Sequence, residues 1–121
     1  MWDRRARLDR VVDGDTVAVE LDQGMGDEKH IEVRLFGVYA PETHEVGGPE
    51  TAAFVRDWFD ALPPAAWPFI VTTLRMKTVD REQMTFTRYV AMVTSLDGSR
   101  SLNADVADFV QTRGYPRGIG G

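Results

Sequence analysis

The chain has 121 residues, of which 43% are hydrophobic and 27% are charged, and its formal net charge is −5. This length suits one domain, which we expect to span residues 1–121, and the apolar runs are too short for a membrane-spanning helix. The acidic balance argues against broad electrostatic affinity for nucleic acid and leaves room only for a local basic site. No cysteine is present, so disulfides, thiolate metal sites and thiol nucleophiles are excluded. Because no apolar signal segment follows the charged start, we expect a cytoplasmic protein.

The first part of the chain has the pattern of β-strands joined by turns. Residues 6–12 lead into Asp13-Gly14-Asp15-Thr16, a turn sequence with glycine near its centre. Residues 16–21 alternate between apolar and polar side chains, and residues 22–29 are polar with two glycines. Such a polar segment predicts a loose connection between antiparallel neighbours.

The segment at residues 31–43, IEVRLFGVYAPET, is the centre of the predicted fold. Alternation places its aliphatic residues on one face of a strand and Arg34 on the other. An arginine beside an apolar core needs an anionic partner. Pro41 ends the strand because proline cannot donate to a β-ladder. If the chain bends at Gly37, Arg34 and Glu42 would reach one pocket.

The clearest periodic signal is a helix that begins after Gly48. Pro49 occupies its first turn, and Glu50 lies near the positive end of the helix dipole. Pro63-Pro64 ends the helix. Four apolar residues at helical spacing predict a face that packs against the core: Val55, Trp58, Phe59 and Leu62.

Two strands and a short helix complete the chain. Residues 67–74 and 89–96 have the strand pattern, and we expect the polar residues 75–87 between them to form a protruding loop. Asn103 is predicted to cap a final helix that Gly114 ends.

Together these elements predict an α+β protein that is mainly β. The most economical arrangement is a small five-stranded OB-type barrel with a helix between strands 3 and 4 and a C-terminal helix. Barrels of this type often bind oligonucleotides, but the scaffold alone does not fix function.

In order and spacing, several motifs resemble the thermonuclease-like (staphylococcal-nuclease-like) domain family over nearly the whole chain. The matching segments are VDGDTV at 12–17, VRLFGV at 33–38, APET at 40–43, GPE at 48–50, RYVA at 88–91 and LNA at 102–104. The resemblance implies an OB-barrel phosphodiesterase that cuts DNA and RNA with calcium, although some relatives keep the fold without catalysis. Nucleic acid is therefore the expected partner.

The resemblance also implies catalytic roles for three residues. Hydrolysis of a phosphodiester needs a positioned water and neutralisation of the charge that grows on the phosphorus oxygens. Arg34 and Arg88 would bind those oxygens, since a guanidinium is planar and stays charged. Glu42 would position or activate the water.

A calcium site is implied at the neighbouring turn. Asp15 would hold the ion with the backbone carbonyl of Ala40 and waters, and Asp13 would support the site, because calcium takes only oxygen ligands. Other divalent ions are alternatives. The family places a second ligand aspartate where this chain has Tyr39, and a phenol is a poor calcium ligand. We therefore expect weak calcium binding.

Each of these residues also has a structural interpretation. Arg34 and Glu42 could form an ion pair that closes the barrel, and Arg88 could be an edge-strand charge that discourages sheet pairing. Asp13 and Asp15 could be ordinary turn residues. The motif order favours a metal-assisted nuclease. The alternative is a catalytically weak or inactive OB-fold module that binds nucleic acid or protein.

Overall fold

A computed structural model of the protein describes residues 2–81 and 84–115. Its five strands form a closed barrel in the order β1-β2-β3-β5-β4, and β4 pairs back with β1. All pairs are antiparallel except β3 with β5, which run parallel. The predicted mainly β barrel is confirmed, with its helices after β3 and after β5. The elements are β1 Trp2–Asp13, β2 Thr16–Gly24, β3 Asp27–Leu35, α1 Gly48–Asp60, β4 Phe69–Arg81, β5 Met84–Ser95 and α2 Leu102–Arg113.

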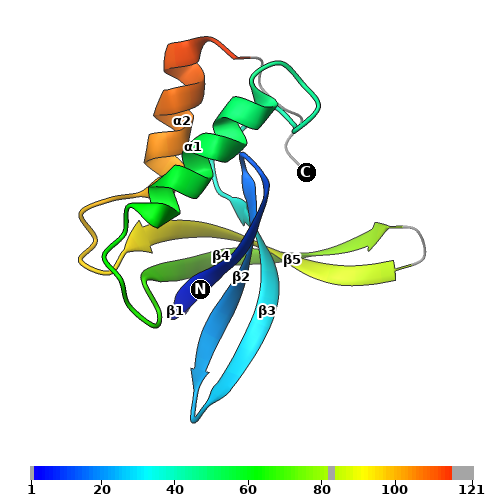
Figure 1. Ribbon diagram of the computed structural model, residues 1–121. Coiled ribbons are helices and arrows are strands. Elements are labelled where there is room, and N and C mark those ends of the chain that lie inside the picture. The colour runs from blue at the N-terminus through cyan, green and yellow to red at the C-terminus, as the bar shows by residue number, and fades with distance from the viewer. Residues whose placement is uncertain (1, 82–83, 116–121) are drawn as a thin grey trace.

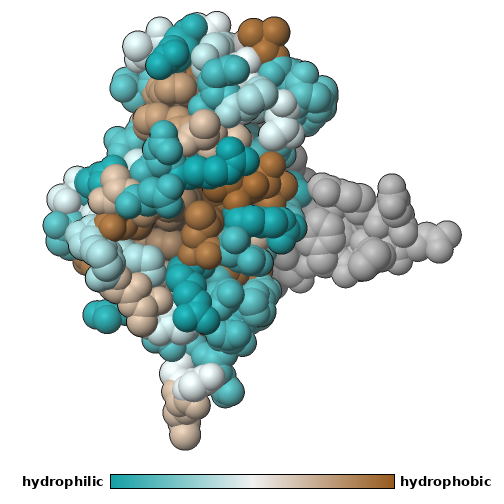
Figure 2. All heavy atoms as spheres, in the orientation of Figure 1, coloured by the Kyte–Doolittle hydropathy of each residue, from teal (hydrophilic) through white to brown (hydrophobic). Residues whose placement is uncertain are grey.

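The two helices lie side by side at one end of the barrel, while the β2–β3 and β4–β5 hairpins project away from it in different directions (Figure 1). Neither helix of the described residues has the length and apolar content needed to cross a membrane. On the face seen in Figure 2, most side chains are hydrophilic, and the apolar ones gather in a band where the helices meet the barrel.

One hydrophobic core fills the barrel and extends under the helices. The predicted alternation on β3 is confirmed, because its aliphatic residues are buried and face the buried residues of β2. Three members of the predicted stripe, Val55, Trp58 and Phe59, are buried on α1, and the fourth, Leu62, is buried just beyond the end of the helix. This core includes Val17, Val19, Leu21, Val33, Leu35, Val55, Trp58, Phe59, Phe69 and Val71.

Two predicted loops are wrong, because the strands on either side continue through them. Residues 22–29 pair across β2 and β3 up to a tight turn at Met25 and Gly26, both with positive φ. Residues 75–81 and 84–87 continue β4 and β5, which pair as far as Arg81 with Met84. In the β2–β3 hairpin, residues 23–29 are exposed, so their side chains do not show the alternation of a half-buried strand although the backbone is paired.

The start of α2 also differs from the prediction. Ser101 is the N-cap, and its hydroxyl accepts from the Ala104 amide at 3.2 Å. Asn103 lies inside the first turn, where its Oδ1 accepts from the Val93 amide at 2.9 Å and its Nδ2 donates to the carbonyls of Phe36 and Ala91, each at 3.0 Å. Asn103 therefore attaches α2 to β5 and to the residue that follows β3 rather than capping the helix.

The turn after β5 leads to a pH-dependent prediction. Asp97 Oδ1 accepts from the Ser99 amide at 3.0 Å, from Ser99 Oγ at 2.7 Å and from Ser95 Oγ at 2.8 Å. These hydrogen bonds, led by that of the Ser99 amide, lower the pKa of Asp97 from 3.8 to about 2. Because the pKa is depressed, the stabilisation is complete above the ordinary pKa and is lost as the pH falls towards the folded value.

We expect Asp97→Asn to lower the melting temperature by a few degrees at about pH 6, and the difference from the parent to shrink at about pH 2.5. Thermal melts followed by circular dichroism at both pH values would measure it, with the exposed Asp60→Asn as control. Equal melting temperatures at the higher pH would contradict the assignment.

Candidate functional site

The site begins at the turn between β1 and β2, where Gly14 has no room for a side chain. A Cβ at this position would collide with the side chain of Thr51 on α1 and approach the Cβ of Ala40. Glycine thus lets the turn pack between the helix and the segment that follows β3. Thr43 fastens the two segments together, since its amide and its hydroxyl donate to Asp13 Oδ1 at 3.3 and 3.1 Å.

Asp15 is the buried carboxylate of this turn, with 9% of its surface exposed. Its Oδ1 accepts from Thr16 Oγ1 at 3.1 Å, and the backbone of Ala40 also hydrogen-bonds to it. Burial raises the pKa of Asp15 above its usual value, and the charge of Asp13 adds to this effect. The hydrogen bonds and the positive charge of Arg34 act in the opposite direction. A desolvated carboxylate of this kind is stabilised by a cation.

Arg34 is buried next to this carboxylate, with 6% of its surface exposed. Its Nη1 and Nη2 donate to the carbonyls of Leu35 and Val38 at 3.3 and 3.1 Å, while Nε is buried without a hydrogen-bond partner among the described residues. The ring of Tyr39 lies 5.2 Å from Cζ. Within the described part of the chain, no carboxylate lies within 4.0 Å of Arg34, so the alternative interpretation of Arg34 and Glu42 as a structural ion pair is wrong.

Arg88 lies on the same face of the sheet, one strand away. Glu32 is opposite Arg88 in the β3–β5 register, and Arg34 is opposite Val90. Arg88 is 8% exposed, and its Nε and Nη2 donate to Glu32 Oε1 at 2.9 and 2.7 Å. β5 has a neighbour on both sides, so the interpretation of Arg88 as an edge-strand charge is wrong.

Glu42 lies in the turn held by Asp13, but its carboxylate points elsewhere. Oε2 is 3.5 Å from His44 Nε2, and the side chain is 50% exposed. The Glu42 amide donates to Glu45 Oε1 at 2.7 Å, and its carbonyl accepts from the Glu45 amide at 2.9 Å. A Cβ at Gly48 would strike the Glu42 carbonyl, so glycine at the start of α1 allows this tight turn. The action of Glu42 on a water stays a prediction.

The residues at this turn offer oxygen ligands that would suit a divalent cation only together with several waters. Asp15 offers a buried carboxylate, and Asp13 is near enough for its charge to act on Asp15. With the carbonyl of Ala40, this set has two carboxylates at most, and calcium takes six to eight oxygen ligands, so waters would supply most of them. Glu42 does not join Asp13 and Asp15 in a group of three close ligand atoms.

A second cluster lies on the outer surface of the β2–β3 hairpin and was not predicted. Glu20, Glu28 and His30 bring one ligand atom each to within 4.8 Å of one another. Arg7 bridges both carboxylates, at 2.8 Å to Glu20 and 2.9 Å to Glu28, and its hydrogen bond lowers the pKa of Glu20. Glu20 and His30 are opposite each other across β2 and β3, next to the hairpin residues 22–29 that were predicted to be a loop. Since Arg7 already neutralises the carboxylates, this exposed cluster is explained as a surface ion-pair network.

Neither a scan against models of known protein families nor a search of curated proteins finds a match to this sequence. Function must therefore be inferred from the geometry of the site and from the order of its motifs.

Proposed function

We propose that this protein is a metal-assisted nuclease that hydrolyses phosphodiester bonds in DNA, RNA or both. The observation that supports this most is Arg34, a buried guanidinium with a free Nε and no ion pair within the described residues, next to a buried carboxylate. A structural arginine in a core is normally satisfied by hydrogen bonds and a counter-ion. A guanidinium that keeps a free donor is suited to an anion that arrives from solution.

In the proposed mechanism, residues of β3 and β5 bind the phosphate, and residues of the turn between β1 and β2 hold the metal ion. Arg34 and Arg88 bind the phosphate from neighbouring strands and stabilise the charge that develops on its oxygens. Asp15, the Ala40 carbonyl and Asp13 would hold calcium or another divalent ion, which when bound helps neutralise that charge and orient water. Glu42 accepts a proton from the attacking water once its side chain turns from His44 towards the site. The 50% exposure of Glu42 leaves this rotation open. As the water oxygen bonds to phosphorus, the bond from phosphorus to the leaving oxygen breaks, and that oxygen takes a proton from solvent.

The test is an assay on plasmid and single-stranded DNA and on RNA, with calcium, magnesium or manganese and with EDTA. We expect cutting that depends on the metal and is lost in EDTA. Absence of cutting with every metal would reject the nuclease proposal.

The second candidate is a catalytically weak or inactive OB-fold module that binds nucleic acid or protein. Two observations favour it: Tyr39 supplies no charge beside Arg34, and the carboxylate of Glu42 lies against His44. A binding titration over a range of salt concentrations would separate its two forms, because affinity for nucleic acid falls steeply with salt.

Tyr39→Asp tests the metal site directly. The Tyr39 ring lies beside Arg34, close to the turn of Asp15, and is 41% exposed. A carboxylate at this position would add the negative charge that the site lacks, so we expect calcium affinity to rise about tenfold and activity to increase. Calorimetric titration of calcium would measure the change, with Tyr39→Asn as a neutral control of similar size. An affinity equal to or below that of the parent would place Tyr39 away from the ion.

A further inference from the structure

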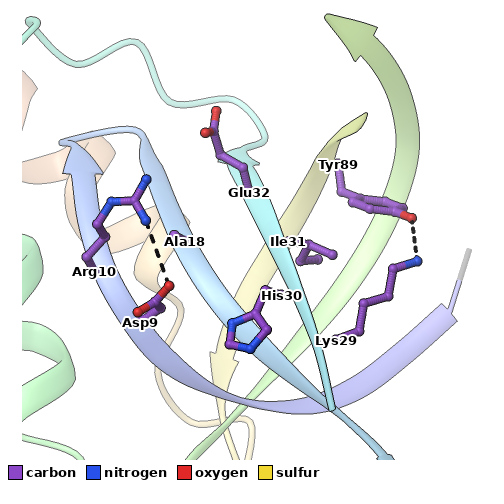
Figure 3. A pocket seen from close by; sticks show the side chains of 8 residues that line it. All are labelled: Asp9, Arg10, Ala18, Lys29, His30, Ile31, Glu32 and Tyr89. Atoms are coloured by element: carbon purple, nitrogen blue, oxygen red, sulfur yellow. Dashed lines mark hydrogen bonds and ion pairs between the residues drawn. The ribbon is translucent and has the colours of Figure 1, made fainter. Parts of the chain in front are cut away.

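Glu32 forms a row of cross-strand neighbours with two arginines. A register shift between Leu8 and Arg10 on β1 brings Arg10 opposite Ala18 on β2, and Ala18 is opposite Glu32 on β3. Glu32 is in turn opposite Arg88 on β5. Ala18 is small, so nothing larger than a methyl group separates Arg10 from Glu32 along this row (Figure 3).

Glu32 now pairs with Arg88 through only one of its oxygens. Both Nε and Nη2 of Arg88 donate to Oε1, and the side chains of Arg88 and Glu32 are 10% and 17% exposed. A phosphodiester offers two oxygens to the same guanidinium, which is the geometry that the planar fork binds best. Glu32 and a substrate phosphate therefore compete for the same edge of Arg88.

On its other side, Glu32 has room to move and a second cation to meet. It borders a depression of about 330 Å³ whose lining includes Arg10, Ala18, Lys29 and His30. Arg10 is held only loosely, since its Nη1 is 3.8 Å from Asp9 and its side chain is 67% exposed. Two strand spacings separate Arg10 from Glu32, about 10 Å, which the two long side chains can span.

We infer that Glu32 is a displaceable carboxylate that guards Arg88. When phosphate binds Arg88, Glu32 Oε1 gives up its hydrogen bonds from Nε and Nη2 of Arg88. The Glu32 side chain then turns across Ala18 to pair with Arg10. Glu32 then opposes the binding of nucleic acid, while Arg10, outside the proposed catalytic residues, promotes it. This inference rests on the proposed function in one respect, that Arg88 binds the phosphate.

The experiment measures binding of a fluorescently labelled ten-nucleotide single-stranded DNA in EDTA, where no metal-dependent cutting occurs. We expect Glu32→Gln to tighten binding about tenfold, because it removes the competing charge. The gain should disappear when Arg88→Ala is added. Arg10→Ala should weaken binding about two- to fivefold, which is the range of an exposed ion pair. Arg5→Ala is the matched control, since Arg5 is exposed on the same strand and outside the row.

The inference is overturned if the Glu32→Gln variant has the parent's melting temperature but binds the DNA no more tightly than the parent. If Glu32→Gln fails to fold, the comparison of Arg10→Ala with Arg5→Ala decides, and equal affinities reject the exchange. Failure of the nuclease proposal looks different: binding shifts as expected while no variant cuts DNA. Conversely, if cutting depends on Arg34 but Glu32→Gln has no effect on binding, the role of Glu32 is rejected and the nuclease proposal stands.

Discussion

Arg34→Ala is expected to lower kcat/KM for DNA cutting about a hundredfold to a thousandfold, the usual loss when one donor to a transition-state charge is removed. The effect should be easiest to interpret at Arg34, because its Nε has no partner in the described structure. Its other hydrogen bonds go to the backbone carbonyls of Leu35 and Val38. Initial rates on a single-stranded substrate with calcium would measure it. Arg5→Ala, which removes the same charge from an exposed site, should keep the parent rate.

Thermal melts must accompany these rates, because Arg34 also donates to the carbonyls of Leu35 and Val38. Arg34→Lys keeps the charge and loses the fork, so a rate between those of parent and alanine variant would identify bidentate binding. Arg88→Ala and Glu42→Gln should be similarly damaging, and Glu42→Gln should leave the fold intact since this side chain is half exposed. If the variants at Arg34, Arg88 and Glu42 all cut DNA at the parent's rate, these three residues have structural roles only.

Phe59→Ala should lower the free energy of unfolding by about 3–5 kcal/mol, because it opens a cavity that the surroundings cannot fill. Phe59 is 8% exposed and packs with the ring of Phe69 at 4.8 Å and with that of Trp58 at 5.2 Å between centroids. Helix α1 packs on the barrel at this point, so the cavity would weaken packing in both the helix and the barrel.

Urea melts of parent and variant would give this difference in free energy. Phe36→Ala is the matched control, because Phe36 is 48% exposed and its removal should cost less than about 1 kcal/mol. A loss below about 1 kcal/mol for Phe59→Ala would mean that this face of α1 is open, and would make it a surface for a partner.

The barrel and the packing of α1 were predictable because their signals are local. Alternation at residues 31–36 and helical spacing at residues 55–62 each need only neighbours in sequence. The outer hairpins were missed for a physical reason. In the β2–β3 hairpin, residues 23–29 are exposed, so they lack the alternation that marks a half-buried strand although the backbone pairing continues through them.

The site was predictable only in part. The turn of Asp13 and Asp15 and the position of Arg34 follow from motif order, and the structure brings them together. The pairing of Arg88 with Glu32 joins residues 56 positions apart across the parallel β3–β5 contact, and nothing local in sequence specifies it. The turn of Glu42 towards His44 depends on side-chain rotation, which motif spacing does not determine.

The hydrogen bonds of Asn103 have a consequence for the order in which the chain folds during synthesis. The Asn103 side chain hydrogen-bonds to the backbone of β5 and of Phe36, the residue after β3, and β5 itself pairs with β3 in the barrel. These contacts are long-range, so a chain still emerging from the ribosome can form the β1–β2–β3 meander early but cannot bring Arg34 and Arg88 to one face. Arg34 and Arg88 therefore share one face only once β5 has paired with β3, and the hydrogen bonds of Asn103 hold α2 against that pairing.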